Sequence, residues 1–164
     1  MTEPMKYGQT EFEVHLPPEL IAAELEPNQV DLPQRTTAEH IRWALDHPID
    51  SAPLKELVKA GDKVCVVISD VTRRWQAPDT YLPILIGELE AAGVRDEDIL
   101  ILSATGTHRR QTEEEHIGLV TKPVYDRIRV EDHVCTDQEN LAYVGTTSRG
   151  TPVWLDKRAL ACDK

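Results

Sequence analysis

Long apolar segments are missing from this sequence, and no window approaches the roughly 18 consecutive apolar residues of a membrane-spanning helix. The start of the chain also lacks the basic stretch followed by an apolar stretch that marks a signal peptide. Membrane insertion is therefore excluded, and we expect a cytoplasmic protein.

Cysteines are few and unpaired. Cys65, Cys135 and Cys162 lie far apart in sequence and lack the CxxC spacing of a zinc knuckle or a redox motif. We expect reduced thiols, with Cys65 a small buried side chain inside the apolar run VCVVIS rather than a reactive group.

Basic charge is also scarce, since the formal net charge is -11 at pH 7. An acidic surface repels phosphate backbones, so nucleic acid is not an expected partner. GxGxxG, Walker A, HExxH and GxSxG motifs are absent from the sequence as well. Their absence argues against dinucleotide binding, P-loop hydrolysis, zinc proteolysis and α/β-hydrolase chemistry.

Prolines interrupt the first third of the chain. We expect residues 1–60 to form a proline-rich amino-terminal wrap with short helices, within one domain fragment that covers residues 1–164. Thr36 and Glu39 have the spacing of a capping box and predict a helix from about 37 to 46. A second apolar stripe predicts a helix over 54–60.

Residues 61–164 alternate between strand and helix patterns. VCVVIS and ILILSA are continuous apolar runs typical of strands buried on both faces of a parallel sheet. The segment between them carries a helical pattern that Thr80 can cap, and a capping box at Thr112 and Glu115 opens another helix. A third strand is predicted over 128–134, and LAYV and PVWL predict a hairpin-like pair. The fold class is therefore α/β, Rossmann-like, with a mostly parallel sheet and flanking helices.

Polar residues follow the first two predicted strands. Ligands of open parallel sheets bind beyond the carboxyl ends of the strands, so these two loops are the expected site. Arginine matches carboxylate or phosphate bidentately, and histidine can exchange a proton near neutral pH. The two loops thus suit a small anionic ligand that undergoes proton chemistry. Their candidate residues are Asp70, Thr72, Arg73, Arg74, His108, Arg109 and Arg110.

Spacing alone leaves the alternatives open. The arginines could be solvated surface charges, and His108 could cap a loop. His133, beside Asp132, could reach the same rim or serve packing, and it ranks after His108. The GTTSRGT loop could bind phosphate or be only a turn.

Several motifs resemble the nickel-dependent lactate racemase family. The matching segments are Tyr7-Gly8, Ser69-Asp70-Val71-Thr72-Arg73, Gly106-Thr107-His108-Arg109, Thr112 to Glu115, the His133 region, and Gly145 to Val153. They occur in the family's order and span nearly the whole chain.

The resemblance implies an isomerase that racemises or epimerises 2-hydroxy acids with a nickel-pincer nucleotide bound to a lysine. His108 would be one of two bases that take the hydroxyl proton while hydride leaves the α-carbon for the cofactor. Arg73 would hold the substrate carboxylate. Asp70 and Thr72 would orient Arg73 or contact the nucleotide, and Gly106 and Thr107 would let backbone approach it.

Three departures from the family pattern qualify this interpretation. Arg74 and Trp75 replace a proline that often follows the motif arginine, so these residues do not single out lactate as the substrate. Asp132-His133-Val134 replaces Asn-His-Asp. The second catalytic histidine, the lysine and the nickel-binding histidine would follow residue 164, so we expect no metal ligand within this chain.

We therefore expect a chain that lacks the carboxyl-terminal domain of its parent enzyme and is inactive alone. The rival hypothesis is a non-catalytic module that binds an anionic metabolite or nucleotide through the same arginines. A nicotinamide oxidoreductase is disfavoured by the missing glycine fingerprint. Which 2-hydroxy acid is the substrate does not follow from the residues.

Overall fold

The computed structural model describes residues 2–31 and 33–164, and the chain divides into two compact units, Met1–Gln34 and Arg35–Lys164. No helix in the described ranges is both long and apolar enough to cross a membrane.

The first unit is built on a β-hairpin that the sequence patterns did not predict. Strands β1 (Thr2–Tyr7) and β2 (Thr10–His15) pair antiparallel, and Gly8 adopts a φ of 61° in the turn between them. Tyr7 and Phe12 meet edge to face with ring centroids 6.4 Å apart. None of the described side chains of residues 2–31 is buried.

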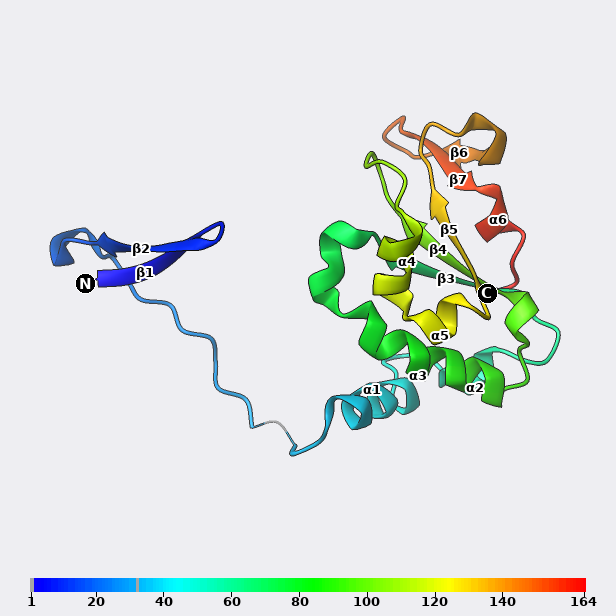
Figure 1. The fold of residues 1–164 in the computed structure, drawn as a ribbon, viewed down its shortest axis with the longest axis horizontal. Helices are drawn as coiled ribbons and strands as arrows, with labels where there is room; N and C mark the ends of the chain where they lie inside the picture. The colour runs from blue at the N-terminus through cyan, green and yellow to red at the C-terminus, as the bar shows by residue number, and fades with distance from the viewer. Residues whose placement is uncertain (1, 32) are drawn as a thin grey trace. The chain divides into compact units, whose positions relative to one another are not determined.

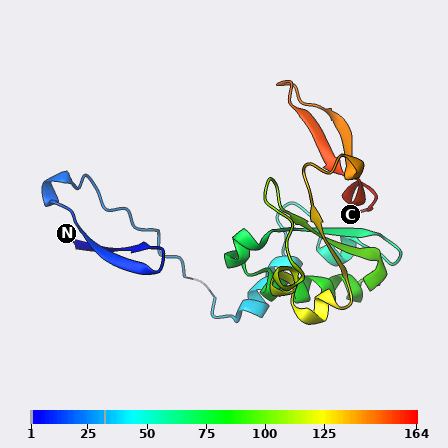
Figure 2. The same cartoon turned by 45° about the horizontal axis from the view of Figure 1, so that its top comes forward.

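The second unit contains the predicted parallel sheet. Strands β3 (Val64–Ser69), β4 (Ile99–Ala104) and β5 (Arg129–His133) pair in the order β3-β4-β5 (Figure 1). Strands β6 (Leu141–Thr146) and β7 (Pro152–Asp156) form a separate antiparallel hairpin, as LAYV and PVWL predicted; Figure 2 shows it standing away from the sheet. The Rossmann-like α/β assignment is confirmed.

Helices cover the sheet mainly on one face. They are α1 (Thr37–Asp46), α2 (Leu54–Leu57), α3 (Pro78–Ala91), α4 (Glu113–Val120), α5 (Lys122–Tyr125) and α6 (Lys157–Leu160). Leu82 of α3 and Leu119 of α4 pack with Ile101 of β4 in the main core, and all three side chains are fully buried. Burial of such aliphatic side chains, at about 1.5–3 kcal/mol each, is the main stabilising term of the unit.

The opposite face of the sheet is only partly covered. Leu100 and Leu102 of β4 are buried there, but Val67 of β3 is 61% exposed. The expectation that both strands are buried on both faces is therefore wrong for β3. Within the unit of residues 35–164, residues of α6 and β7 lie over this face next to Leu100 and Leu102, and they leave Val67 largely exposed.

Helix starts follow the capping signals in two cases and depart from them in a third. The capping boxes of Thr36 at α1 and Thr112 at α4 are both formed. Helix α3, however, begins at Pro78 rather than after Thr80. Ala77 precedes it in the left-handed conformation with a φ of 52°, and a proline in the first turn sacrifices no helical hydrogen bond.

Candidate functional site at the carboxyl rim of the sheet

Two loops leave the sheet side by side. Ser69, the last residue of β3, pairs in register with Ala104, the last residue of β4. A 3₁₀ segment (Val71–Gln76) follows β3, and a tight turn closed by the His108 N–H on the Thr105 carbonyl follows β4. The prediction that these strands are neighbours with loops at one rim is confirmed.

Asp70 and His108 join the two loops. His108 Nδ1 lies 2.5 Å from Asp70 Oδ2, and the Thr72 hydroxyl donates to Asp70 Oδ1 at 2.6 Å. The Asp70 side chain is 2% exposed, whereas that of His108 is 47% exposed. Burial raises the pKa of Asp70, but the hydrogen bonds from Thr72 and His108 outweigh it and hold the pKa below its usual value.

This pairing orients the imidazole. An ionised carboxylate only accepts hydrogen bonds, so Asp70 favours a proton on Nδ1 of His108. The other ring nitrogen, Nε2, is then an acceptor on a side chain that is half exposed. The geometry is that of a buried acid holding a solvent-facing base.

Arg73 lies three residues after Asp70 and is exposed. Its backbone N–H donates to the Asp70 carbonyl at 3.0 Å, but its guanidinium forms no hydrogen bond or ion pair with the residues that the structure describes. The side chains of Asp70 and Thr72 bond to His108 and to each other and make no hydrogen bond to the Arg73 side chain, while the alternative that they contact a nucleotide stays a prediction.

The other loop arginines are held by the protein. Arg109 donates to both carboxylate oxygens of Glu115, at 2.8 and 2.7 Å, and so anchors the start of α4. Arg110 lies 3.7 Å from the carboxylate of Asp137. The Arg74 guanidinium packs against Gly118 of α4, where an added Cβ would lie 3.2 Å from its Nη1.

The loop after β4 exposes backbone beside His108. Gly106 has a φ of 60°, which glycine adopts without strain, and an added Cβ there would meet no atom within 4 Å. Thr107 is exposed, whereas Thr105 is buried and donates its hydroxyl to the His133 carbonyl. The loop therefore leaves room for a ligand to approach its backbone.

Gln111 connects the ends of all three parallel strands, although no motif marked it. Its Oε1 accepts the Val71 N–H at 2.7 Å, and its Nε2 donates to Ser103 Oγ at 2.8 Å and to Asp132 Oδ1 at 2.7 Å. Its backbone N–H donates to the other Asp132 oxygen at 2.7 Å. One amide side chain thus fixes the two loops relative to each other.

Asp132 is a second buried acid, and it holds His116. Nε2 of His116 lies 2.8 Å from Asp132 Oδ1. Burial raises the pKa of Asp132, but hydrogen bonds from His116 and Gln111 lower it below its usual value overall. This contact gives His116 a structural role between α4 and β5.

His133 belongs to a different cluster. Its Nδ1 lies 3.1 Å from Asp156 Oδ2, and Arg158 donates to both oxygens of Asp156. Burial raises the pKa of Asp156, but Arg158 and His133 bring it down to about 2. An apolar hollow of about 420 Å³ adjoins His133 between β4 and α6. No contact of His133 with His108 or Arg73 is formed, so its role in the site stays a prediction.

Metal-binding side chains do not gather in the described ranges. Among residues 2–31 and 33–164, no group of three or more His, Cys, Asp or Glu side chains is placed to hold a metal ion. Among the described residues, the rim of β3 and β4 therefore offers one imidazole, the guanidinium groups of Arg73 and Arg74 without a hydrogen bond or ion pair, and open loop backbone.

Relatives of known identity share this chain's sequence and fold. The lactate racemase of Lactiplantibacillus plantarum is 31% identical over 126 residues, which is 76% of this chain and 29% of that protein. The lactate racemase of Thermoanaerobacterium thermosaccharolyticum is 27% identical over 158 residues, which is 96% of this chain and 37% of that protein. The chain thus spans about a third of the length of these relatives.

A solved structure and a family model agree with these matches. The lactate racemase apoprotein from Thermoanaerobacterium thermosaccharolyticum superposes with a TM-score of 0.80 at 27% identity, covering 99% of this chain and 37% of that one. The model of the lactate racemase N-terminal domain matches residues 7–164. The chain, with its paired Asp70 and His108 at the rim of a parallel sheet, therefore belongs to the lactate racemase N-terminal domain family.

Proposed function

We propose that this chain is the substrate-facing amino-terminal part of an isomerase that racemises or epimerises a small 2-hydroxy acid. The observation that supports the proposal is the Asp70–His108 pair at the rim of the sheet, followed three residues after Asp70 by the exposed Arg73, whose guanidinium has no hydrogen bond or ion pair among the described residues. Family membership and the two relatives named lactate racemase support the class of reaction.

His108 is the proposed catalytic base. With Nδ1 held by Asp70, Nε2 is free to take the hydroxyl proton of the substrate and to return it. A histidine suits both directions, because its ordinary pKa of about 6.5 lies near neutrality.

Asp70 is proposed as a positioning residue rather than a substrate contact. Its buried carboxylate fixes the tautomer and orientation of His108 and stabilises the imidazolium that forms when the proton is taken. Thr72 in turn fixes Asp70 through its hydroxyl.

Arg73 is proposed to bind the substrate carboxylate. Its guanidinium has no protein carboxylate to satisfy it within the described residues, unlike Arg109, which is bound by Glu115. A bidentate arginine limits rotation of the bound acid and so sets which face of its α-carbon meets His108. Arg74 is a secondary candidate for the same anion.

The cofactor expected for this family is a nickel-pincer nucleotide, which when bound would supply the hydride acceptor and donor. The rim fits part of such a group: Gly106 and Thr107 offer open backbone, and Thr72 offers a hydroxyl at the same edge. The described residues supply no cluster for nickel. We propose that nickel ligands and the attachment lysine come from the longer protein, as does a carboxyl-terminal domain.

The test is a racemisation assay on the full-length, cofactor-loaded protein with a panel of single-enantiomer 2-hydroxy acids. His108→Gln should lower kcat by about 10²–10⁴-fold, the usual contribution of a general base. Arg73→Ala should raise KM more than it lowers kcat. Arg42→Ala, at an exposed residue of α1 of the same type and outside every candidate site, is the matched control and should leave both unchanged.

Asp70→Asn separates positioning from binding. It should lower kcat and alter the pH profile of kcat while leaving KM nearly constant, because only the orientation and charge of His108 change. No turnover of any 2-hydroxy acid by the loaded protein would contradict the proposal. Anion binding without turnover would favour a non-catalytic binding module, and racemisation by the isolated 164-residue chain without cofactor would refute the need for further residues.

A further inference from the structure

The last residue of the chain pairs with β3. The Lys164 N–H donates to the Lys63 carbonyl at 3.2 Å, and the Lys164 carbonyl accepts the Cys65 N–H at 2.8 Å. Lys63 and Cys65 are the residues before and after Val64. In a parallel pair of strands, a residue donates its N–H to one of two such flanking residues and accepts an N–H from the other, which is the pattern seen here. Lys164 therefore makes the first step of a fourth parallel strand.

The rest of that edge of β3 is open. Backbone groups alternate between the two edges of a strand, so Val67 and Ser69 direct theirs to the same outer edge as Cys65. Neither has a backbone partner on that edge among residues 2–31 and 33–164. An unpaired edge beside an apolar side chain that is 61% exposed is a ready template for another strand.

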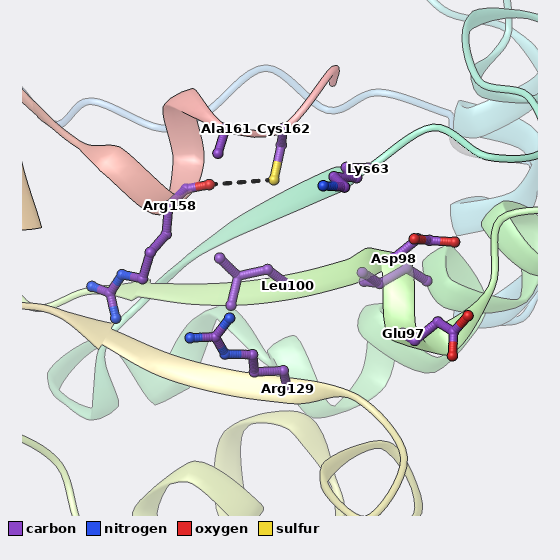
Figure 3. Close-up of a pocket in the computed structure, with 9 residues that line it drawn as sticks. Lys63, Glu97, Asp98, Leu100, Arg129, Arg158, Ala161 and Cys162 are labelled. Carbon is purple, nitrogen blue, oxygen red and sulfur yellow. Dashed lines mark hydrogen bonds between the residues drawn. The ribbon is translucent and has the colours of Figure 1, made fainter.

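The position of α6 supplies an independent argument. Helices α3 and α4 pack on one face of the sheet, whereas Ala161 and Cys162, just after α6, lie on the side to which Leu100 points (Figure 3). Connections between parallel strands are right-handed. The chain advances across the sheet from β3 to β5 with its helices on one face, so a connection that returns from β5 to the outer edge of β3 must run over the other face. Helix α6 lies on that face.

We propose that the outer edge of β3 receives a fourth parallel strand, formed by the polypeptide that continues from Lys164 in the longer protein. The sheet order would become new strand-β3-β4-β5, with the topological switch point between the new strand and β3. The matched part of this chain covers only 29% and 37% of the two relatives, so proteins of their length have enough further residues to supply such a strand.

A strand that starts at Lys164 and follows β3 to Ser69 would end beside Asp70. Ligands of such sheets bind at the switch point, beyond the carboxyl ends of the strands. The residues directly after the new strand would then lie at the same rim as His108 and Arg73. This last consequence rests on the proposed function, whereas the strand itself does not.

Amide hydrogen exchange, measured on the 164-residue chain and on the longer polypeptide, tests the proposal. In the 164-residue chain, the amides of Val67 and Ser69 should exchange freely and that of Cys65 more slowly. In the longer polypeptide, exchange of the Val67 and Ser69 amides should slow by about a hundredfold or more, as expected for amides in a central strand. The amide of Val66, which faces β4, is the internal control and should be slow in both.

Several outcomes would overturn the proposal. In the longer polypeptide, exchange at Val67 and Ser69 could stay unchanged, or the amide of Val130 on the outer edge of β5 could slow instead. The reading frame could end at Lys164. In the 164-residue chain, protection of these amides could rise with protein concentration. The last would assign the edge to a second copy. Since none of these measurements uses turnover, failure of the strand and failure of the racemase proposal are distinguishable.

Discussion

Replacing Gln111 with alanine should destabilise the unit of residues 35–164 by about 2–3 kcal/mol. The change removes three hydrogen bonds, to the Val71 N–H, the Ser103 hydroxyl and the Asp132 carboxylate. A neutral hydrogen bond contributes about 1 kcal/mol net and one to a charged group about 1.5–3 kcal/mol. Together the three bonds would amount to about 3.5–5 kcal/mol. Asp132 keeps its bond from His116, and water can enter beside a half-buried residue and replace part of the lost bonding, so we expect the smaller loss of about 2–3 kcal/mol.

Urea unfolding followed by far-UV circular dichroism measures this change. Gln138→Ala is the matched control, because Gln138 is exposed and its side chain makes no hydrogen bond within the described part of the chain; it should shift the free energy of unfolding by less than about 0.5 kcal/mol. If Gln111→Ala behaved like this control, the amide would not join the strand ends in solution, and our description of the rim would be wrong.

Three further predictions concern pH, backbone and thiol reactivity. Asp156 has a folded pKa of about 2, below its ordinary 3.8, so it contributes stability above pH 4 that is lost as the pH falls towards 2. The pKa values of Asp70 and Asp132 are lowered as well, so in thermal unfolding against pH Asp156→Asn should remove only part of the loss, at most about 2 kcal/mol; a parallel pH dependence in the variant would contradict the assignment. Gly93→Ala should destabilise by more than about 1 kcal/mol, because Gly93 has a φ of 92° and its added Cβ would lie 3.1 Å from Ala60. Gly118→Ala in α4 should cost little or stabilise, because only the mobile end of Arg74 must move; denaturant midpoints that rank the two variants in reverse would refute this. Cys65 is only partly buried, and not buried as the sequence predicted, but this burial raises its pKa to about 11. Iodoacetamide at pH 8 should therefore label exposed Cys135 far sooner, as mass spectrometry can follow; equal rates would count against the partial burial of Cys65.

Local signals predicted much of the α/β unit. The capping boxes at Thr36 and Thr112 fix two helix starts within a few residues of sequence, and the apolar runs of β3 and β4 need no distant partner to be recognised. The start of α3 escaped prediction because Ala77 takes a left-handed conformation that its type does not favour. The exposure of Val67 escaped because an apolar run does not reveal which face lacks a cover.

The sequence predicted where the candidate site lies in the fold, but not which side chains contact one another there. Parallel strands end at one edge, so the spacing of Asp70 and His108 after two such strands was enough to bring them to one rim. That Asp70 binds His108 rather than orienting Arg73 depends on side-chain directions that sequence does not encode locally. Gln111 carried no signal, because its three partners are 8 to 40 residues away in the chain.

The hairpin of β1 and β2 has a thermodynamic consequence. An isolated two-stranded hairpin is marginally stable in water, and the described side chains of this unit bury little apolar surface. Heat absorbed on melting should therefore come almost entirely from the other unit, which comprises about 130 residues. At the usual specific enthalpy, a calorimetric trace would show one peak of about 90 kcal/mol near 60 °C, with the first 34 residues contributing to the baseline.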